Sequence, residues 1–89
     1  MKRVQAFTLK NELGLHARVA ATLVNTAKRF KARITYERDG IIVDGKSILG
    51  ILTLACPKGG RIIIVADGPD SAEAMKAFET LIEDKFGEE

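Results

Sequence analysis

The only histidine of this 89-residue chain, His16, lies where a strand-like segment gives way to a helical pattern. Downstream of it, apolar residues recur with the three-and-four spacing of one helix face. These residues are Ala20, Leu23, Val24, Ala27 and Phe30. His16 is therefore expected at or just before the start of a helix that runs to residue 28 or 29.

A histidine at a helix start has a particular chemical environment. The first backbone N–H groups of a helix lack intrahelical partners, and with the aligned peptide dipoles they attract anions. The same positive end favours the neutral imidazole, whose ring nitrogen can act as a nucleophile. Arg18, in the first turn, offers a planar fork of donors suited to phosphate oxygens, and Gly14 allows a tight turn into the helix. A lone histidine is more often an ordinary surface residue. The combination with Gly14 and Arg18 instead predicts that His16 accepts a phosphoryl group.

Composition excludes several other classes of protein. The length predicts a single domain over residues 1–89, and 46% hydrophobic residues are typical of a globular fold. One cysteine, Cys56, and one histidine are too few for a disulfide or for a zinc or iron–sulfur site, so no metal and no cofactor is expected. No apolar run approaches the roughly 20 residues that span a bilayer. A cytoplasmic protein without membrane insertion is expected.

The net charge of +2 hides an uneven distribution of charged residues. Residues 1–36 contain eight Lys or Arg and one acid, whereas residues 67–89 contain eight acids and two lysines. The basic part predicts a face for an acidic partner or an anionic group. The acids are expected to cover the solvated outer face of a C-terminal helix.

Alternating apolar and polar residues predict strands, and capping residues predict where the helices begin. The expected order is strand, helix, strand, strand, helix, strand, helix. In chain order the segments are 2–9, 16–29, 33–37, 41–43, 47–52, 61–66 and 70–87. Two strand–helix–strand units joined by a hairpin at Asp39-Gly40 predict an α+β fold. This fold is an open-faced β-sandwich, in which a four-stranded antiparallel sheet carries three helices on one face.

Three details of this fold are open to direct test. Phe7 and Leu9 are expected to point toward the helices. Asp70 is expected to cap the last helix, with Glu73 completing a capping box, and Gly87 to end it. The open face of the sheet is expected to carry Val4, Ala6, Ile63 and Val65.

The short helix after Ser47 is apolar on nearly every side. Ser47 suits its N-cap, because the hydroxyl can accept a hydrogen bond from a free backbone N–H. A short surface helix cannot bury all of its sides, so some of Ile48, Leu49 and Leu52 are expected to face solvent as a partner-binding surface. Burial statistics alone would equally allow all of the large residues to lie in the core.

Two motifs together resemble the HPr family, the histidine-containing phosphocarriers of the bacterial phosphoenolpyruvate-dependent sugar phosphotransferase system. They are Gly14-Leu15-His16-Ala17-Arg18, and Lys46-Ser47-Ile48-Leu49-Gly50 followed by a Gly-rich loop and the strand at Ile62-Ile63-Ile64. The resemblance covers essentially the whole chain. It implies a carrier that accepts a phosphoryl group on Nδ1 of His16 from phosphorylated Enzyme I and passes it to the A component of Enzyme II, with Arg18 assisting at the phosphate. It implies a phosphohistidine intermediate rather than a stand-alone enzyme.

The same resemblance implies regulation and docking. Ser47 corresponds to the target of a regulatory HPr kinase/phosphorylase, although a plain N-cap serine is the alternative. The implied partner-binding surface consists of Arg18, Lys28, Ile48, Leu49 and Leu52, and a monomer is expected. Two positions depart from the family pattern: Asn25 stands where lysine is common, and Val19 stands where proline is usual.

The sequence is compatible with three alternatives. The first is an HPr-like carrier of a regulatory or nitrogen-related branch that feeds no sugar transporter. The second is an RNA-recognition module, which would need aromatic residues on the open face of the sheet, yet Phe7 and Tyr36 are both expected under the helices. The third is a hydrolase, which has no triad partner beside His16 or Cys56. No nucleic-acid partner is expected.

Overall fold

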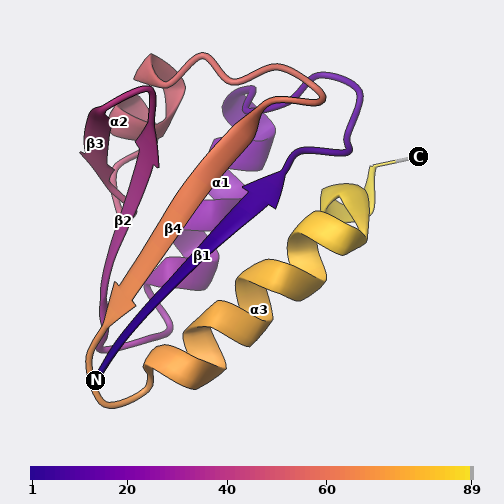
Figure 1. Cartoon of the computed structure of the whole chain (residues 1–89). Helices are drawn as coiled ribbons and strands as arrows, with labels where there is room; N and C mark the ends of the chain where they lie inside the picture. The colour runs from indigo at the N-terminus through magenta and orange to yellow at the C-terminus, as the bar shows by residue number, and fades with distance from the viewer. Residues whose placement is uncertain (89) are drawn as a thin grey trace.

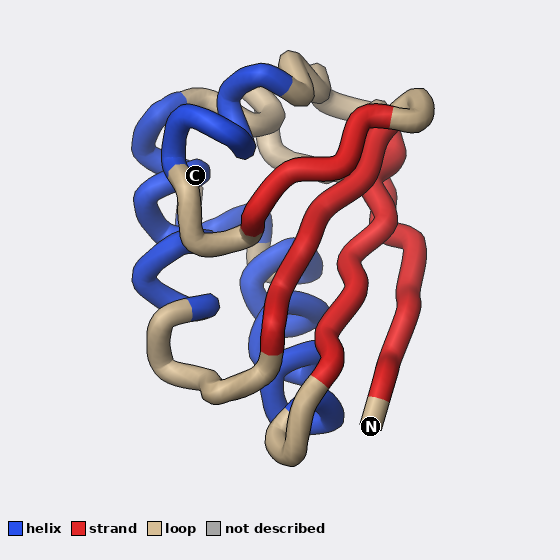
Figure 2. Tube along the Cα trace, turned by 90° about the vertical axis from the view of Figure 1, so that its left-hand side faces the viewer, coloured by secondary structure: helices blue, strands red, loops and turns tan. Residues whose placement is uncertain are grey.

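The computed structural model describes residues 1–88 and has two layers, a sheet and a set of helices on one of its faces (Figures 1 and 2). The antiparallel sheet has the order β1-β4-β2-β3. Its strands are β1 (Lys2–Thr8), β2 (Arg33–Arg38), β3 (Ile41–Asp44) and β4 (Arg61–Asp67). The helices are α1 (Ala17–Ala27), α2 (Ile48–Thr53), α3 (Ser71–Glu83) and the 3₁₀ turn η1 (Lys85–Gly87). The predicted open-faced β-sandwich is confirmed.

The alternation of side chains along the strands explains the two layers. Phe7 on β1 pairs with Ile62 on β4, and Tyr36 on β2 pairs with Ile64, and all four side chains are buried beneath the helices. Leu9, just beyond β1, is buried as well, as predicted. The opposite face carries cross-strand pairs of Val4 with Val65 and of Ala6 with Ile63, whose members are exposed or half-buried. The prediction of an open face is confirmed.

The inward faces of α1 and α3 complete the core. On α1 the predicted stripe is fully buried, apart from Phe30, which is half-buried beyond the helix end. Val19 is also buried, with 1% of its surface exposed, so this side chain packs in the core. On α3, Ala74, Phe78 and Ile82 are buried, and Leu81 is half-buried against them. The rings of Phe78 and Tyr36 meet edge to face at 6.0 Å.

The hairpin between β2 and β3 follows from two residues. Asp39 and Gly40 both have positive φ, at 53° and 82°. Two left-handed residues in sequence form the type I′ turn, whose twist matches that of the flanking strands. The predicted hairpin is therefore confirmed in its position and its turn residues.

Asp70 is the N-cap residue of α3, but its side chain does not cap that helix. The carboxylate accepts hydrogen bonds from the backbone N–H groups of Lys31, at 2.8 Å, and Ala32, at 2.9 Å. Both donors belong to the loop between α1 and β2. The predicted capping box with Glu73 is wrong, because the carboxylate oxygens of Asp70 are used to hold a distant loop to the start of α3.

This arrangement predicts a pH-dependent contribution of Asp70 to stability. The hydrogen bond from the Lys31 N–H, with a smaller contribution from the Ala32 N–H, lowers the pKa of Asp70 below its ordinary 3.8. A carboxyl group whose pKa is lower in the folded state stabilises the fold above its unfolded pKa, and that contribution is lost as the pH falls through the folded value. We expect Asp70→Asn to lower the thermal unfolding midpoint at pH 7 and to match the parent protein well below pH 3.8.

Thermal unfolding followed by circular dichroism at both pH values measures this effect. Glu79→Gln removes an exposed carboxylate from the same helix and should leave the difference between the two pH values unchanged. An Asp70→Asn protein equally destabilised at neutral and at acidic pH would show that the loop is held by something other than the ionised carboxylate.

The C-terminal end of α3 differs from the prediction. The helix ends at Glu83, not at Gly87. Lys85, Phe86 and Gly87 then follow with φ of 53°, 56° and 72°. Three successive left-handed residues reverse the direction of the chain, and Phe86 packs against the core. The segment after α3 therefore brings Glu88 to His16 at the start of α1.

Candidate functional site

His16 is the N-cap residue of α1, as predicted. Its backbone is extended, with φ −87° and ψ 176°, and its carbonyl accepts the first helical hydrogen bond from Ala20 N–H at 2.9 Å. Among residues 1–88, the N–H groups of Ala17, Arg18 and Val19 have no hydrogen-bond partner. The helix therefore begins with three free donors at the site. A proline at position 19 would remove one of them.

The loop before His16 is held by close packing and by hydrogen bonds. Gly14 has φ +62°, and a Cβ at this position would lie 2.2 Å from the carbonyl oxygen of Cys56. Leu15 N–H donates to that same carbonyl at 2.9 Å. Asn11, with 1% of its surface exposed, donates from Nδ2 to the Gly14 carbonyl at 2.8 Å. These contacts set where His16 leaves the loop and enters the helix.

An anion lies at this site within the protein itself, the carboxylate of Glu88. Its Oε2 is 2.7 Å from Nε2 of His16 and accepts a hydrogen bond from Nη2 of Arg18, also at 2.7 Å. Its Oε1 accepts from Nδ2 of Asn11 at 3.1 Å. Three side chains from the start of the chain thus converge on one carboxylate from its end, and a phosphate presents the same kind of oxygens.

The charge state of Glu88 decides the direction of its hydrogen bond with His16. The hydrogen bond from Arg18, supported by those from Asn11 and His16, lowers the pKa of Glu88 from 4.5 to about 2. At neutral pH the carboxylate is therefore ionised and can only accept, so Nε2 of His16 must donate. Within residues 1–88 the other ring nitrogen, Nδ1, has no hydrogen-bond partner.

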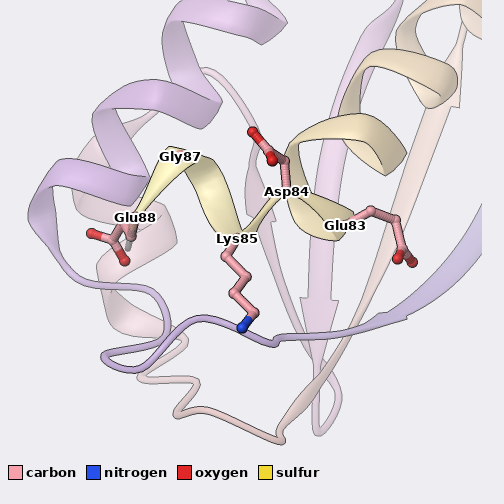
Figure 3. A pocket seen from close by; sticks show the side chains of 5 residues that line it. All are labelled: Glu83, Asp84, Lys85, Gly87 and Glu88. Carbon is pink, nitrogen blue, oxygen red and sulfur yellow. The ribbon is translucent and has the colours of Figure 1, made fainter.

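Both predicted chemical residues are accessible. The His16 side chain is 26% exposed and the Arg18 side chain 75% exposed. The C-terminal turn beside them also lines an open hollow of about 440 Å³, in which the side chain of Glu88 points away from that of Glu83 (Figure 3). The imidazole can thus be reached by a partner protein without opening the fold.

Asn11 and Glu88 were not predicted from the sequence. The signal for Glu88 was the charge asymmetry between the two ends of the chain. The expectation that the C-terminal acids cover a solvated helix face is wrong for Glu88, which is 13% exposed and pairs with Arg18, and for Asp70, which holds the α1–β2 loop. Glu83 stays solvated, at 60% exposure, and pairs with Lys10 at 2.7 Å. No sequence pattern around Asn11 predicts its role, because its hydrogen bonds to Gly14 and Glu88 depend on the folded shape of the loop.

The residues of α2 lie where the sequence predicts. The Ser47 hydroxyl accepts a hydrogen bond from Gly50 N–H at 3.0 Å, which confirms the N-cap. Ile48 and Leu49 are exposed, at 40% and 77%, whereas Leu52 is half-buried. Ile51 is the member of the helix that enters the core.

The structure does not bring all of the predicted site residues together. Lys46, just before α2, donates from Nζ to the Phe30 carbonyl, beyond the C-terminal end of α1. Cys56, just after α2, accepts from Leu15 N–H near the N-terminal end of α1. The two helices therefore run in opposite directions. Lys28, the C-cap residue of α1, lies about 16 Å from His16 along this 11-residue helix. Lys46, the neighbour of Ser47, contacts that same end of α1.

The alternative chemistries find no support at these positions. Phe7 and Tyr36 are buried under the helices, so they provide no stacking platform for bases. Cys56 is buried, and burial raises the pKa of its thiol. Residues 1–88 contain no group of three or more His, Cys, Asp or Glu placed to hold a metal ion. In the same residues no helix has the length and apolar character to cross a membrane.

The fold and site define a class of small open-faced α+β proteins that present a histidine and an arginine to an anion at a helix start. The family profile described as "PTS HPr component phosphorylation site" matches residues 4–84. The phosphocarrier protein HPr of Cupriavidus necator is 44% identical over 81 residues, which cover 91% of each chain. The crystal structure of HPr-C-His from Thermoanaerobacter tengcongensis is 45% identical, covers 98% of each chain and superposes with a TM-score of 0.94. The chain belongs to the HPr family of phosphocarriers of the phosphotransferase system.

Proposed function

We propose that this chain acts as one phosphocarrier domain over residues 1–89. Nδ1 of His16 takes a phosphoryl group from phosphorylated Enzyme I and passes it to the A component of a sugar-specific Enzyme II. The observation that carries this proposal is the position of the His16 ring at the start of α1, beside Arg18 and the free backbone N–H groups, with no hydrogen-bond partner of Nδ1 within residues 1–88. As in other members of the family, we expect the reaction to take place in the cytoplasm.

Each group at the site has a role in this transfer. The Nδ1 lone pair of His16 attacks phosphorus, the N–P bond forms, and the bond to the donor breaks with its electron pair returning to the donor. Arg18 and the free N–H groups at the helix start hold the phosphate oxygens. These donors are exposed and each contributes about 1 kcal/mol or less, so the phosphoryl group is held without being trapped.

Labelling with phosphoenolpyruvate tests the proposal. The chain is incubated with Enzyme I and radiolabelled phosphoenolpyruvate, and the label is then located by peptide mapping. We expect one acid-labile, base-stable phosphate on His16. Absence of label, or label on any other residue, would refute the proposal. A second incubation with A components identifies the acceptor, and transfer only to a nitrogen-related component would assign the chain to a regulatory branch.

The partners are expected to dock on a ridge formed by both helices, made of Arg18, Lys28, Ile48, Leu49 and Leu52. In support of this surface, α2 carries the exposed apolar residues Ile48 and Leu49 and packs against α1, which has Arg18 in its first turn and Lys28 at its C-cap. Apolar and basic residues on neighbouring helices would fit an acidic partner with an apolar centre. We expect the carrier to work as a monomer, although a crystal structure of an HPr dimer from Thermoanaerobacter tengcongensis is 46% identical to this chain. Sedimentation at micromolar concentration tests the monomer.

Ser47 is the proposed regulatory site, modified by an HPr kinase/phosphorylase. It caps the end of α2 whose neighbour, Lys46, contacts the end of α1 opposite His16, so a phosphate there would act on the docking ridge. We expect Ser47→Asp to slow phosphorylation by Enzyme I by about 10-fold, because a new negative charge faces an acidic partner. Initial rates of labelling measure the effect. Thr80→Asp adds the same charge on exposed α3 and should react at the parent rate. Equal rates for the two variants would remove the regulatory role.

A further inference from the structure

The contact between His16 and Glu88 has a consequence for which ring nitrogen reacts. A neutral imidazole carries its proton on one nitrogen and its lone pair on the other. The ionised carboxylate of Glu88 accepts at 2.7 Å from Nε2 of His16. The proton is therefore held on Nε2, and the lone pair lies on Nδ1.

Glu88 is itself held firmly in place. Its side chain is only 13% exposed, and its two oxygens accept from Arg18 and from the buried amide of Asn11. Asn11 is in turn fixed by its second hydrogen bond, to the Gly14 carbonyl. The carboxylate is therefore fixed by donors from two elements, and its position does not depend on His16 alone.

The backbone after α3 is also shaped to deliver this carboxylate. Lys85 and Phe86 are non-glycine residues in the left-handed region, a conformation that costs on the order of 1 kcal/mol each. Phe86 anchors the turn by packing against the core. Strained backbone of this kind persists where the surrounding structure requires it, and here it places the carboxylate of Glu88 2.7 Å from Nε2 of His16.

We propose that Glu88 is a positioning residue for phosphoryl transfer, which fixes the Nε2–H tautomer of His16 and so makes Nδ1 the nucleophile. This inference rests on the proposed function. When Nδ1 attacks, the N–P bond forms and the bond from phosphorus to the donor breaks, with its electron pair leaving on the donor atom. The ring keeps its Nε2 proton and gains a positive charge, which the carboxylate of Glu88 balances. On transfer to the acceptor, the Nδ1 lone pair is restored and the charge disappears.

Glu88→Ala tests this role with two measurements. Long-range ¹H–¹⁵N correlation spectra at pH 9, where an ordinary imidazole is neutral, report which ring nitrogen carries the proton. We expect the parent protein to show Nε2–H, and the variant to show a mixture of tautomers. We expect the rate of phosphorylation by Enzyme I to fall by about 10-fold, the lower end of the loss typical when a hydrogen-bond partner that orients a metal-ligating histidine is removed.

Glu83→Ala is the matched control, because it removes a neighbouring carboxylate that pairs with Lys10 and does not contact His16. It should keep the parent tautomer and rate. A Glu88→Ala protein with the parent tautomer and rate would overturn the inference while leaving the proposed function intact. A faster rate would also overturn it, since Glu88 would then be competing with phosphate for Arg18. A parent protein that takes no label at all would instead refute the proposed function.

Discussion

Replacing His16 with glutamine is expected to abolish phosphorylation by Enzyme I. Glutamine retains the length and polarity of the side chain but has no nucleophilic nitrogen. Loss of the nucleophile in a covalent mechanism costs on the order of 10⁶-fold in rate, so no label should be detectable. The fold should survive, because the ring is partly exposed and its one hydrogen-bond partner among the described residues is Glu88. Circular dichroism checks the fold, and radiolabelled phosphoenolpyruvate checks the reaction.

A relocated histidine provides the control for this experiment. His16 is the only histidine of the chain, so labelling of imidazole is unambiguous. Val4 is 60% exposed on the open face of the sheet, and Val4→His combined with His16→Gln restores an imidazole away from the helix start and from Arg18. This double variant should also take no label. Label on the relocated histidine would show that the surroundings of His16 do not direct the reaction.

Gly14→Ala is expected to have the largest effect on stability. A Cβ at this position would lie 2.2 Å from the Cys56 carbonyl oxygen and 2.8 Å from Cα of Pro57, both backbone atoms that cannot rotate away. The left-handed conformation at φ +62° adds to the cost. Overpacking and backbone strain together predict a loss of about 3 kcal/mol or more in the free energy of unfolding. Urea denaturation measures this loss as a lower midpoint.

Gly59→Ala separates the two contributions. Gly59 also has a left-handed backbone, at φ +84°, but nothing lies within 4 Å of an added Cβ. This variant should lose only the conformational part, about 1 kcal/mol. If both variants lost the same amount, the packing of Gly14 against Cys56 would not be what holds the loop. The folded fraction of the Gly14→Ala protein should also be phosphorylated slowly. The hydrogen bonds of Asn11 to Gly14 and of Leu15 to Cys56 both depend on the close packing of Gly14 against Cys56.

The location of the site follows from the demands of transfer between proteins. A carrier must offer its phosphoryl group to successive partners, so the ring cannot be enclosed. Here the ring is reached from solvent, while the groups that orient it are buried or clamped. Different residues thus serve the two needs. Arg18 is exposed and can contact a phosphate on the solvent side of the ring, whereas Asn11 and Glu88 orient the ring from the inner side.

Much of this protein could be predicted from the sequence, because the signals are local. Helix face, strand alternation and hairpin turn depend on residues a few positions apart, and so does the N-cap hydroxyl of Ser47. The position of His16 at a helix start follows from the same short-range periodicity, and Arg18 from its place in the first turn. The geometry of a short surface helix also favoured exposure of some of its apolar residues, but only the structure decided that these are Ile48 and Leu49.

Only the tertiary structure decided the contacts between distant segments. The sequence around Asp70 predicts a helix N-cap. Its carboxylate instead accepts hydrogen bonds from the backbone N–H groups of Lys31 and Ala32, because the α1–β2 loop lies beside it in the folded chain. Glu88 meets His16 across 72 positions of sequence, after a reversal at Phe86 that no periodicity marks. The physical reason is the range of the interactions. Backbone preference and side-chain periodicity act within a few residues, whereas the hydrogen bonds that orient His16 form between segments that meet only after the sheet and helices have packed.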